Sequence, residues 1–236
     1  MKTARFHFDA DLRSLLSLDQ RGDGFDLAFR GPQSVKHLIE SLGIPHTEIG
    51  LLTANGNPIG LGYIVHDGDK ISVQPEAPEI CQNEPRFILD GHLGRLAAHL
   101  RMLGLDCLYR SDYDDPELAQ ISINDGRILL TRDRRLLMQK RITRGYLLRS
   151  LDPEEQLQEV VRRYTLGDWI KPFHRCLRCN HPLEPVRKEE ILERLEPLTK
   201  LYFEEFHICP ACRQIYWKGS HYDKMQKLIE QIRADE

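Results

Sequence analysis

The sequence lacks long hydrophobic runs, a strong excess of either charge, internal repeats and low-complexity tracts. No apolar run approaches the roughly 18 residues that a membrane-spanning helix needs, so we expect no membrane partner. The first thirteen residues alternate charged with apolar side chains, unlike a secretory signal. The 33 basic and 36 acidic residues exclude a uniformly basic nucleic-acid coat. Because 41% of the 236 residues are apolar, we expect a hydrophobic core. Since the sequence shows neither a membrane span nor a secretory signal, we expect a cytoplasmic protein.

Cysteine is scarce, and four of the six cysteines stand in two Cys-x-x-Cys pairs separated by 29 residues. In a cytoplasmic chain this usage points away from disulfides and toward a metal. Each pair can present two thiolates to one ion, and two pairs complete a tetrahedral sulfur shell that favours Zn²⁺. Such a shell leaves no open ligand position, so we predict a structural zinc ion. Its ligands would be Cys176, Cys179, Cys209 and Cys212.

Residues 1–78 have the pattern of a small α+β domain. Two stretches of alternating apolar residues, with a Gly-Asp-Gly turn before the second, predict a β-hairpin. Ser34 is typical of a helix N-cap, and apolar residues at helical spacing follow it until Gly43. Further strands are expected near 49–52 and 71–73. The order of elements is then strand, strand, helix, strand, strand, with the helix packed on one sheet face.

Residues 86–168 instead alternate short apolar strands with helices, which predicts a mainly parallel α/β sheet with helices on both faces. The expected strands are 87–89, 107–109, 128–130 and 146–148, and one of the intervening helices is expected over 134–141. Residues 75–85, with three prolines and three glutamates, read as a linker, which we place at 79–85 between the two domains. Residues 169–236 hold the cysteine pairs and an amphipathic stretch at 222–233.

Acidic residues follow the predicted strand ends of the 86–168 segment. Asp90 comes directly after the first strand, Asp115 follows the second, and Asp133 follows the third. Because ligands of open parallel sheets gather outside the carboxyl ends of the strands, we expect these carboxylates to converge. A hard divalent cation such as Mg²⁺, held by Asp90 and Asp133, would relieve their repulsion. Such a cation activates water and stabilises the charge that develops in phosphodiester hydrolysis.

Each acid also has a structural interpretation. Asp115 precedes Pro116 and suits a helix N-cap, and Asp133 could cap the helix that follows it. Asp90 precedes Gly91 and could belong to a turn. The hypothesis of a catalytic site therefore depends on the convergence of the three acids.

Basic residues are concentrated in one part of the chain. Residues 1–78 carry 7 basic and 10 acidic groups, whereas residues 85–149 carry 12 and 8. Between Arg127 and Arg149 there are eight basic residues and a single acid, Asp133. This cluster can hold a polyanion, or it can form an ordinary solvated helix face.

The motifs SVKHLIESLGIP, NGNPIG and DGDKISVQP resemble ubiquitin-like sulfur carriers of the ThiS/MoaD type. The resemblance implies a β-grasp fold for residues 1–78. Those carriers end in a free Gly-Gly whose carboxylate is activated, whereas Val73-Gln74-Pro75 occupies that place here and the chain continues. We therefore expect an interaction or positioning role, with a protein as a possible partner, rather than thiocarboxylate chemistry.

Residues 85–232 contain FILDGHLGRLAAHLRMLGLD, DDPELAQ, RILLTRDRRLL, both cysteine pairs and IYWKGSHYDKM, and they resemble the Mut7-C ribonuclease domain. The resemblance implies a PIN-like nuclease core at 86–168, followed by a zinc ribbon and a C-terminal helix at 169–236. It implies that Asp90, Asp115 and Asp133 form the acidic site. It places Arg132, Arg134 and Arg135 beside the substrate phosphate.

The leading hypothesis is a metal-dependent ribonuclease that uses Mg²⁺ or Mn²⁺ to hydrolyse RNA. The alternative is a non-catalytic RNA-binding or adaptor protein that uses the zinc ribbon and the arginine-rich surface. A partner protein related to sulfur carriers is a third class, against which the missing Gly-Gly argues.

Overall fold

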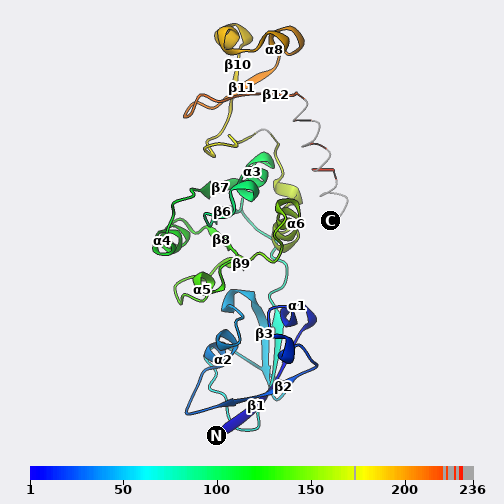
Figure 1. Cartoon of the computed structure of the whole chain (residues 1–236), viewed down its shortest axis with the longest axis vertical. Coiled ribbons are helices and arrows are strands. Elements are labelled where there is room, and N and C mark those ends of the chain that lie inside the picture. Colours follow the sequence, from blue (N-terminus) through cyan, green and yellow to red (C-terminus); the bar gives the residue numbers. More distant parts are fainter. Residues whose placement is uncertain (173, 220–221, 223–225, 227–228, 231–236) are drawn as a thin grey trace. The chain divides into compact units, whose positions relative to one another are not determined.

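The structure is a computed structural model that describes residues 1–172, 174–219, 222, 226 and 229–230. The chain divides into two compact units, which are described one at a time (Figure 1). The first unit comprises Met1–Ala77 and Asp115–Leu148, and the second comprises Pro78–Asp114 and Arg149–Glu236. The segment predicted as a nuclease core thus contributes to both units.

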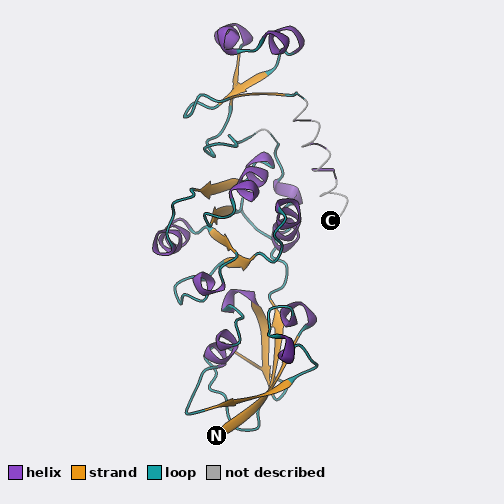
Figure 2. Cartoon of the chain, viewed as in Figure 1, coloured by secondary structure: helices purple, strands orange, loops and turns teal. Residues whose placement is uncertain are grey.

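The N-terminal part of the first unit is a five-stranded sheet in the order β2-β1-β5-β3-β4 (Figure 2). Strand β1 pairs antiparallel with β2 and parallel with β5, and β3 pairs antiparallel with β4 and β5. This is the predicted ubiquitin-like fold. The elements are β1 (Lys2–Phe8), α1 (Ala10–Arg13), η1 (Leu18–Gln20), β2 (Phe25–Phe29), α2 (Val35–Ser41), η2 (His46–Glu48), β3 (Ile49–Ala54), β4 (Asn57–Ile59) and β5 (Lys70–Pro75).

The sequence pattern of this sheet is realised residue by residue. Ala4, Phe6 and Phe8 of β1 are buried while their neighbours are exposed, which is the period-two pattern of a half-buried strand. The Ser34 side chain accepts a hydrogen bond from the His37 backbone N–H and caps α2. The short elements α1 and β4 were not predicted, because four and three residues are too few to establish a period.

The rest of the first unit contains α4 (Asp115–Asp125), β8 (Ile128–Thr131), α5 (Arg134–Leu137) and β9 (Gly145–Leu147). All residues of β8 and β9 are buried, and the two strands pair in parallel as predicted. Helix α5 is shorter than the predicted 134–141. After Leu137 the chain turns and buries Ile142, because it must return to β9 within a few residues.

The second unit contains β6 (Arg86–Leu89), α3 (Gly94–Met102), β7 (Asp106–Tyr109), α6 (Pro153–Tyr164) and η3 (Gly167–Trp169). Strands β6 and β7 pair in parallel, and α3 packs against β7 and α6. The Asp152 side chain caps α6 by accepting hydrogen bonds from the Glu154 and Glu155 backbone N–H groups.

The cysteine pairs belong to a three-stranded antiparallel sheet in the order β10-β11-β12, with the first pair before β10 and the second between β11 and β12. A small apolar cluster, built around Phe206 and Ile191, fills the space between this sheet and its helical insert. The elements are β10 (Glu184–Val186), α7 (Lys188–Ile191), η4 (Leu192–Arg194), α8 (Pro197–Tyr202), β11 (Phe206–Ile208) and β12 (Ile215–Trp217). Most of the amphipathic stretch predicted at 222–233 lies outside the described residues.

Within the part of the chain that the structure describes, no helix combines the length and the apolar character needed to cross a membrane.

Candidate functional site

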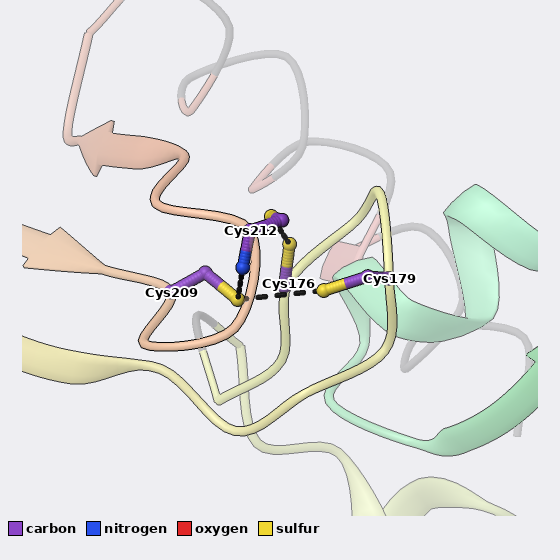
Figure 3. A group of neighbouring side chains, drawn as sticks. All are labelled: Cys176, Cys179, Cys209 and Cys212. Atoms are coloured by element: carbon purple, nitrogen blue, oxygen red, sulfur yellow. Dashed lines mark hydrogen bonds between the residues drawn. The ribbon is translucent and has the colours of Figure 1, made fainter.

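The four predicted zinc ligands come together at one end of the ribbon sheet, in the turn before β10 and in the turn between β11 and β12. Figure 3 shows Cys176, Cys179, Cys209 and Cys212 directed toward one another from two turns. Their sulfur atoms all lie within 4.8 Å of one another. The Cys176 and Cys212 sulfurs are 3.5 Å apart, and those of Cys179 and Cys209 are 3.4 Å apart. Among the residues described, these cysteines are the one group of three or more potential ligands within coordinating distance of a common ion.

The two turns that present the cysteines have the same backbone construction. Asn180 and Arg213, each directly after the second cysteine of its pair, have φ angles of 68° and 61°. Their N–H groups donate to the carbonyl oxygens of Cys176 and Cys209, at 2.9 and 2.8 Å. The left-handed residue reverses the chain, so that both thiols of a pair lie on the same side.

The thiol cluster fits a zinc ion. A tetrahedral ion with Zn–S bonds of about 2.3 Å requires sulfur–sulfur separations of about 3.8 Å, close to those observed. The Tyr216 hydroxyl lies 3.2 Å from the Cys176 sulfur and accepts a hydrogen bond from the Leu177 N–H at 3.0 Å. Burial alone would raise the pKa of the Cys176 thiol, but hydrogen bonds from Tyr216 and from backbone N–H groups lower this pKa to about 7. The surroundings of Cys176 thus favour the thiolate that zinc binds, whereas burial raises the pKa of the Cys179 thiol to about 12.

A buried arginine connects the first cysteine turn to the neighbouring α3 and β7. Arg101 of α3 is 4% exposed. Its Nε donates to the Cys107 carbonyl oxygen at 2.9 Å, and its Nη1 donates to the carbonyl oxygens of Leu177 and Arg178, each at 3.0 Å. The residues between Cys176 and Cys179 are therefore anchored to the strand that precedes the acidic loop.

Asn180 makes a second connection to β7. Its Oδ1 accepts a hydrogen bond from the Cys107 N–H at 2.9 Å, and its Nδ2 donates to the Asp106 carboxylate at 2.8 Å. The left-handed backbone of Asn180 shapes the cysteine turn while its side chain satisfies the buried backbone of β7. Sequence analysis missed Arg101, Asn180 and Tyr216. An asparagine directly after a Cys-x-x-Cys pair was the available signal for Asn180.

Asp90 lies where it was predicted, directly after the buried strand β6, and it is half-buried. The following turn is fixed by two contacts to the end of β7. The Tyr109 hydroxyl donates to the Gly91 carbonyl oxygen at 2.9 Å. A Cβ at Gly91 would lie 2.8 Å from the Ser111 carbonyl oxygen, so only glycine fits this approach.

The acids that follow β7 have different roles. Arg110 forms a two-pronged contact with Asp112, at 2.9 and 2.7 Å, and these hydrogen bonds lower the pKa of Asp112. Asp112 is thus held by a cation of its own chain. Asp114 and Asp115 are exposed, and Asp115 is the first residue of α4.

Asp133 is exposed and caps α5. Its Oδ1 accepts a hydrogen bond from the Arg135 N–H at 2.7 Å, and its own N–H donates to the Thr131 hydroxyl at 2.9 Å. The capping interpretation of Asp133 is therefore confirmed. A metal-binding role for its second carboxylate oxygen stays a prediction.

The predicted phosphate-binding arginines differ in their surroundings. Arg132 and Arg135 are exposed. Arg134 is half-buried, and its Nη1 donates to the carbonyl oxygens of Leu15 at 2.7 Å and Gly43 at 3.2 Å. The guanidinium of Arg134 thus binds the ubiquitin-like domain.

Asp115 and Asp133 belong to the first unit and Asp90 to the second. The convergence of the three acids, and their catalytic role, stay predictions.

Comparison with known families shows to which family the chain belongs. The Mut7-C RNAse domain matches residues 85–229, more than half of the chain. The chain belongs to the Mut7-C family. The Mut7-C ubiquitin domain matches residues 1–80 of this Mut7-C protein. The two matches agree with the two family resemblances expected from the sequence. The RNAse domain supports a ribonuclease-type function.

Solved structures similar to this Mut7-C chain cover its N-terminal third. One is small archaeal modifier protein 1 of Haloferax volcanii, at 15% identity and a TM-score of 0.28, matching 33% of this chain and 100% of that one. Another, from Pyrococcus furiosus, is assigned as subunit 1 of a molybdopterin converting factor, at 16% identity and a TM-score of 0.28, with the same coverage. Comparison with curated proteins finds no match.

Proposed function

We propose that this Mut7-C protein is a metal-dependent ribonuclease that hydrolyses RNA phosphodiester bonds at the carboxyl ends of β6 and β8. The match of residues 85–229 to an RNAse domain carries the proposal. In it, Asp90 and Asp133 hold Mg²⁺ or Mn²⁺ and Asp115 is the third acid. Carboxylates are the hard oxygen donors that these ions prefer, so the chemistry of the donor set fits.

The two strand ends support this assignment locally. Asp90 emerges from a fully buried segment into a turn that Tyr109 and the close approach to Ser111 hold in place. The Asp133 N–H donates to the Thr131 hydroxyl, and its Oδ1 accepts from the Arg135 N–H, so Oδ2 is left for a cation. Carboxylates that are already held in place need less rearrangement when they bind a metal ion.

A divalent cation held by Asp90 and Asp133 would supply an activated water molecule and would stabilise charge on the scissile phosphate. The carboxylates of Asp90 and Asp133 would fix the position of the cation. The exposed guanidinium groups of Arg132 and Arg135 contact phosphate oxygens of the substrate and orient the backbone. Arg134 is left out of this contact, because its guanidinium binds backbone carbonyls of the ubiquitin-like domain.

The test is cleavage of single-stranded and structured RNA by the purified chain, with Mn²⁺ or with excess chelator. We expect cleavage that the chelator abolishes and that Asp90→Asn reduces. Asp168→Asn is the matched control, because Asp168 is an exposed acid of the same unit. Chelator-resistant cleavage contradicts the metal dependence. Tight RNA binding without cleavage under any condition favours the adaptor function instead.

The phosphate contacts have their own test. Each phosphate neutralised on single-stranded RNA contributes about 0.7 to the slope of log affinity against log salt. The double variant Arg132→Ala with Arg135→Ala should therefore flatten the slope by about 1.4. An unchanged slope would mean that these two side chains are only solvated.

A further inference from the structure

Three polar contacts inside the first unit join the ubiquitin-like domain to the nuclease segment 131–148. The first is made by Glu48 of η2, a carboxylate that is 4% exposed. Its Oε1 accepts a hydrogen bond from the Leu147 backbone N–H at 2.8 Å. A carboxylate in such a buried position is costly unless hydrogen bonds satisfy it, so this contact is specific.

The Glu48 carboxylate binds a backbone N–H group at the edge of β9 where a further strand would otherwise pair. Directly after β9 the Leu148 N–H donates to the Thr131 carbonyl oxygen of β8, at 2.9 Å, whereas the N–H of Leu147, the last residue of β9, donates to Glu48. Strand β9 is the last strand of its sheet. An open edge with unpaired N–H groups invites pairing with another chain, and the Glu48 carboxylate closes this edge.

His46 makes the second contact. Its Nε2 lies 2.8 Å from the Ile142 carbonyl oxygen in the loop between α5 and β9. Its Nδ1 lies 2.8 Å from the carboxylate of Glu40 in α2. The imidazole ring thus bridges an acid of the ubiquitin-like domain and the backbone of the nuclease segment.

Arg134, directly after Asp133, makes the third contact through the carbonyl oxygens of Leu15 and Gly43. Gly43 has a φ angle of +92°, and a Cβ there would lie 3.0 Å from Arg134 Nη1. The close approach of the guanidinium therefore depends on the glycine that ends α2.

We propose that the ubiquitin-like domain is a fixed brace of the nuclease segment, which holds β9 through Glu48 and the start of α5 through Arg134, and thereby positions Asp133. The part that concerns Asp133 rests on the proposed function. Arg134 and Glu48 are then positioning residues, which act on the reaction through Asp133.

The length of α5 explains why a brace is needed. A helix of four residues has no stability of its own, because helix nucleation is unfavourable. The contacts of Arg134 and the packing of Leu136 and Leu137 therefore fix its first turn. If Arg134 is released, Asp133 loses the Arg135 N–H that orients its carboxylate.

Amide hydrogen exchange in the full chain tests the brace without reference to activity. In Glu48→Ala, the Leu147 amide should exchange at least about tenfold faster, since its acceptor is lost. The Leu148 amide, bonded to β8, is the internal reference. Glu48→Gln should restore protection, because the glutamine side-chain oxygen can still accept. Unchanged exchange at Leu147 in Glu48→Ala overturns the brace.

RNA cleavage tests the positioning of Asp133. Glu48 is buried and does not contact substrate, so Glu48→Ala should lower kcat about fivefold or more while KM stays within about twofold. Glu48→Gln should restore kcat, and Asp19→Ala, at an exposed acid of the same domain, should match the wild type. Faster exchange at Leu147 with an unchanged kcat overturns the positioning role.

A second variant keeps the proposal testable if Glu48→Ala does not fold. Arg134→Met removes the bonds to Leu15 and Gly43 without leaving a buried charge. It should accelerate exchange of the Arg135 amide, which is bonded to Asp133, and unchanged exchange there overturns the brace. If the wild-type chain cleaves no RNA, the proposed function and the positioning of Asp133 fail together. The exchange data then decide the brace alone.

Discussion

The cysteine cluster and the acidic strand ends are two predicted metal sites that depend on the chain in different ways. The thiols come from two turns of four residues each, and a left-handed residue after each turn brings both sulfurs to the same side. The acids come from three strand ends, and each carboxylate also serves, or could serve, a local structural role. Local spacing therefore specifies the zinc site, whereas the acidic site depends on how distant segments assemble.

The largest effect is expected at the zinc site, where zinc binding and the folding of the ribbon should depend on each of the four cysteines. Cys179→Ser should lose the ion and unfold the ribbon locally, because structural zinc contributes of order 10 kcal/mol to such small domains. Elemental analysis should give about one zinc per wild-type chain. Less than about 0.3 zinc per chain in native protein would contradict the prediction. Cys81→Ser, at a cysteine outside both Cys-x-x-Cys pairs, is the matched control and should keep its zinc.

The acidic site should respond through rate rather than through folding. Asp90→Asn and Asp133→Asn keep size but remove the charge that holds a cation, and each should slow cleavage at least about 10²-fold. RNA binding should persist, because the loss of a carboxylate lessens repulsion of phosphate. The measurement is single-turnover cleavage alongside RNA affinity.

Asp152→Asn is the matched control for Asp133→Asn, because Asp152 also caps a helix and asparagine is an equally good cap. If Asp133 serves only as a cap, both variants will cleave RNA at the wild-type rate. Wild-type rates in both Asp90→Asn and Asp133→Asn would mean that the active site lies elsewhere.

The difference between the two sites also explains what the sequence could predict. Most strands of the ubiquitin-like sheet and each cysteine pair follow from patterns within ten or fewer neighbouring residues, and the parallel pairs follow from the alternation of strands with helices. Glu48 and Arg101 carry no such pattern, because their partners lie 99 and 76 residues away. The family resemblance placed Arg134 beside the phosphate, and nothing in the sequence shows that its Nη1 binds carbonyl oxygens of the ubiquitin-like domain.

A third prediction concerns Asn180, whose side chain connects the first cysteine turn to β7. It tests whether this turn depends on contacts outside the turn. Asn180→Ala should destabilise the second unit by about 3 kcal/mol, because it leaves the buried Cys107 N–H without an acceptor and places alanine at φ 68°. Thermal unfolding and amide exchange at Cys107 measure the effect. Arg213 occupies the same backbone position in the second turn, so Arg213→Ala is the control. Equal effects of both variants would show that the turn, and not its bond to β7, is what matters.

The smallest effect concerns Asp69, an acid whose position, unlike that of the strand-end acids, is set by groups close to it. The carboxylate accepts hydrogen bonds from the His66 N–H at 2.8 Å, the Asn55 side chain at 2.8 Å and the Tyr63 hydroxyl at 3.0 Å. Burial alone would raise the pKa of Asp69, but these hydrogen bonds lower it below its ordinary value. Because the folded-state pKa is the lower one, the stabilisation is complete above the unfolded-state pKa of about 3.9 and is lost as pH falls through the folded-state value.

Asp69→Asn should therefore cost about 1 kcal/mol near neutral pH, since asparagine keeps one acceptor oxygen but not the charge. The difference in unfolding free energy between the two proteins should shrink below about pH 4, where the Asp69 carboxylate of the unfolded wild-type chain begins to bind a proton. Urea titrations at several pH values measure both quantities, and Asp67→Asn, in the same turn, is the control. A difference that stays constant down to pH values well below the unfolded-state pKa would show that the charge of Asp69 contributes nothing, and that only its shape holds the turn.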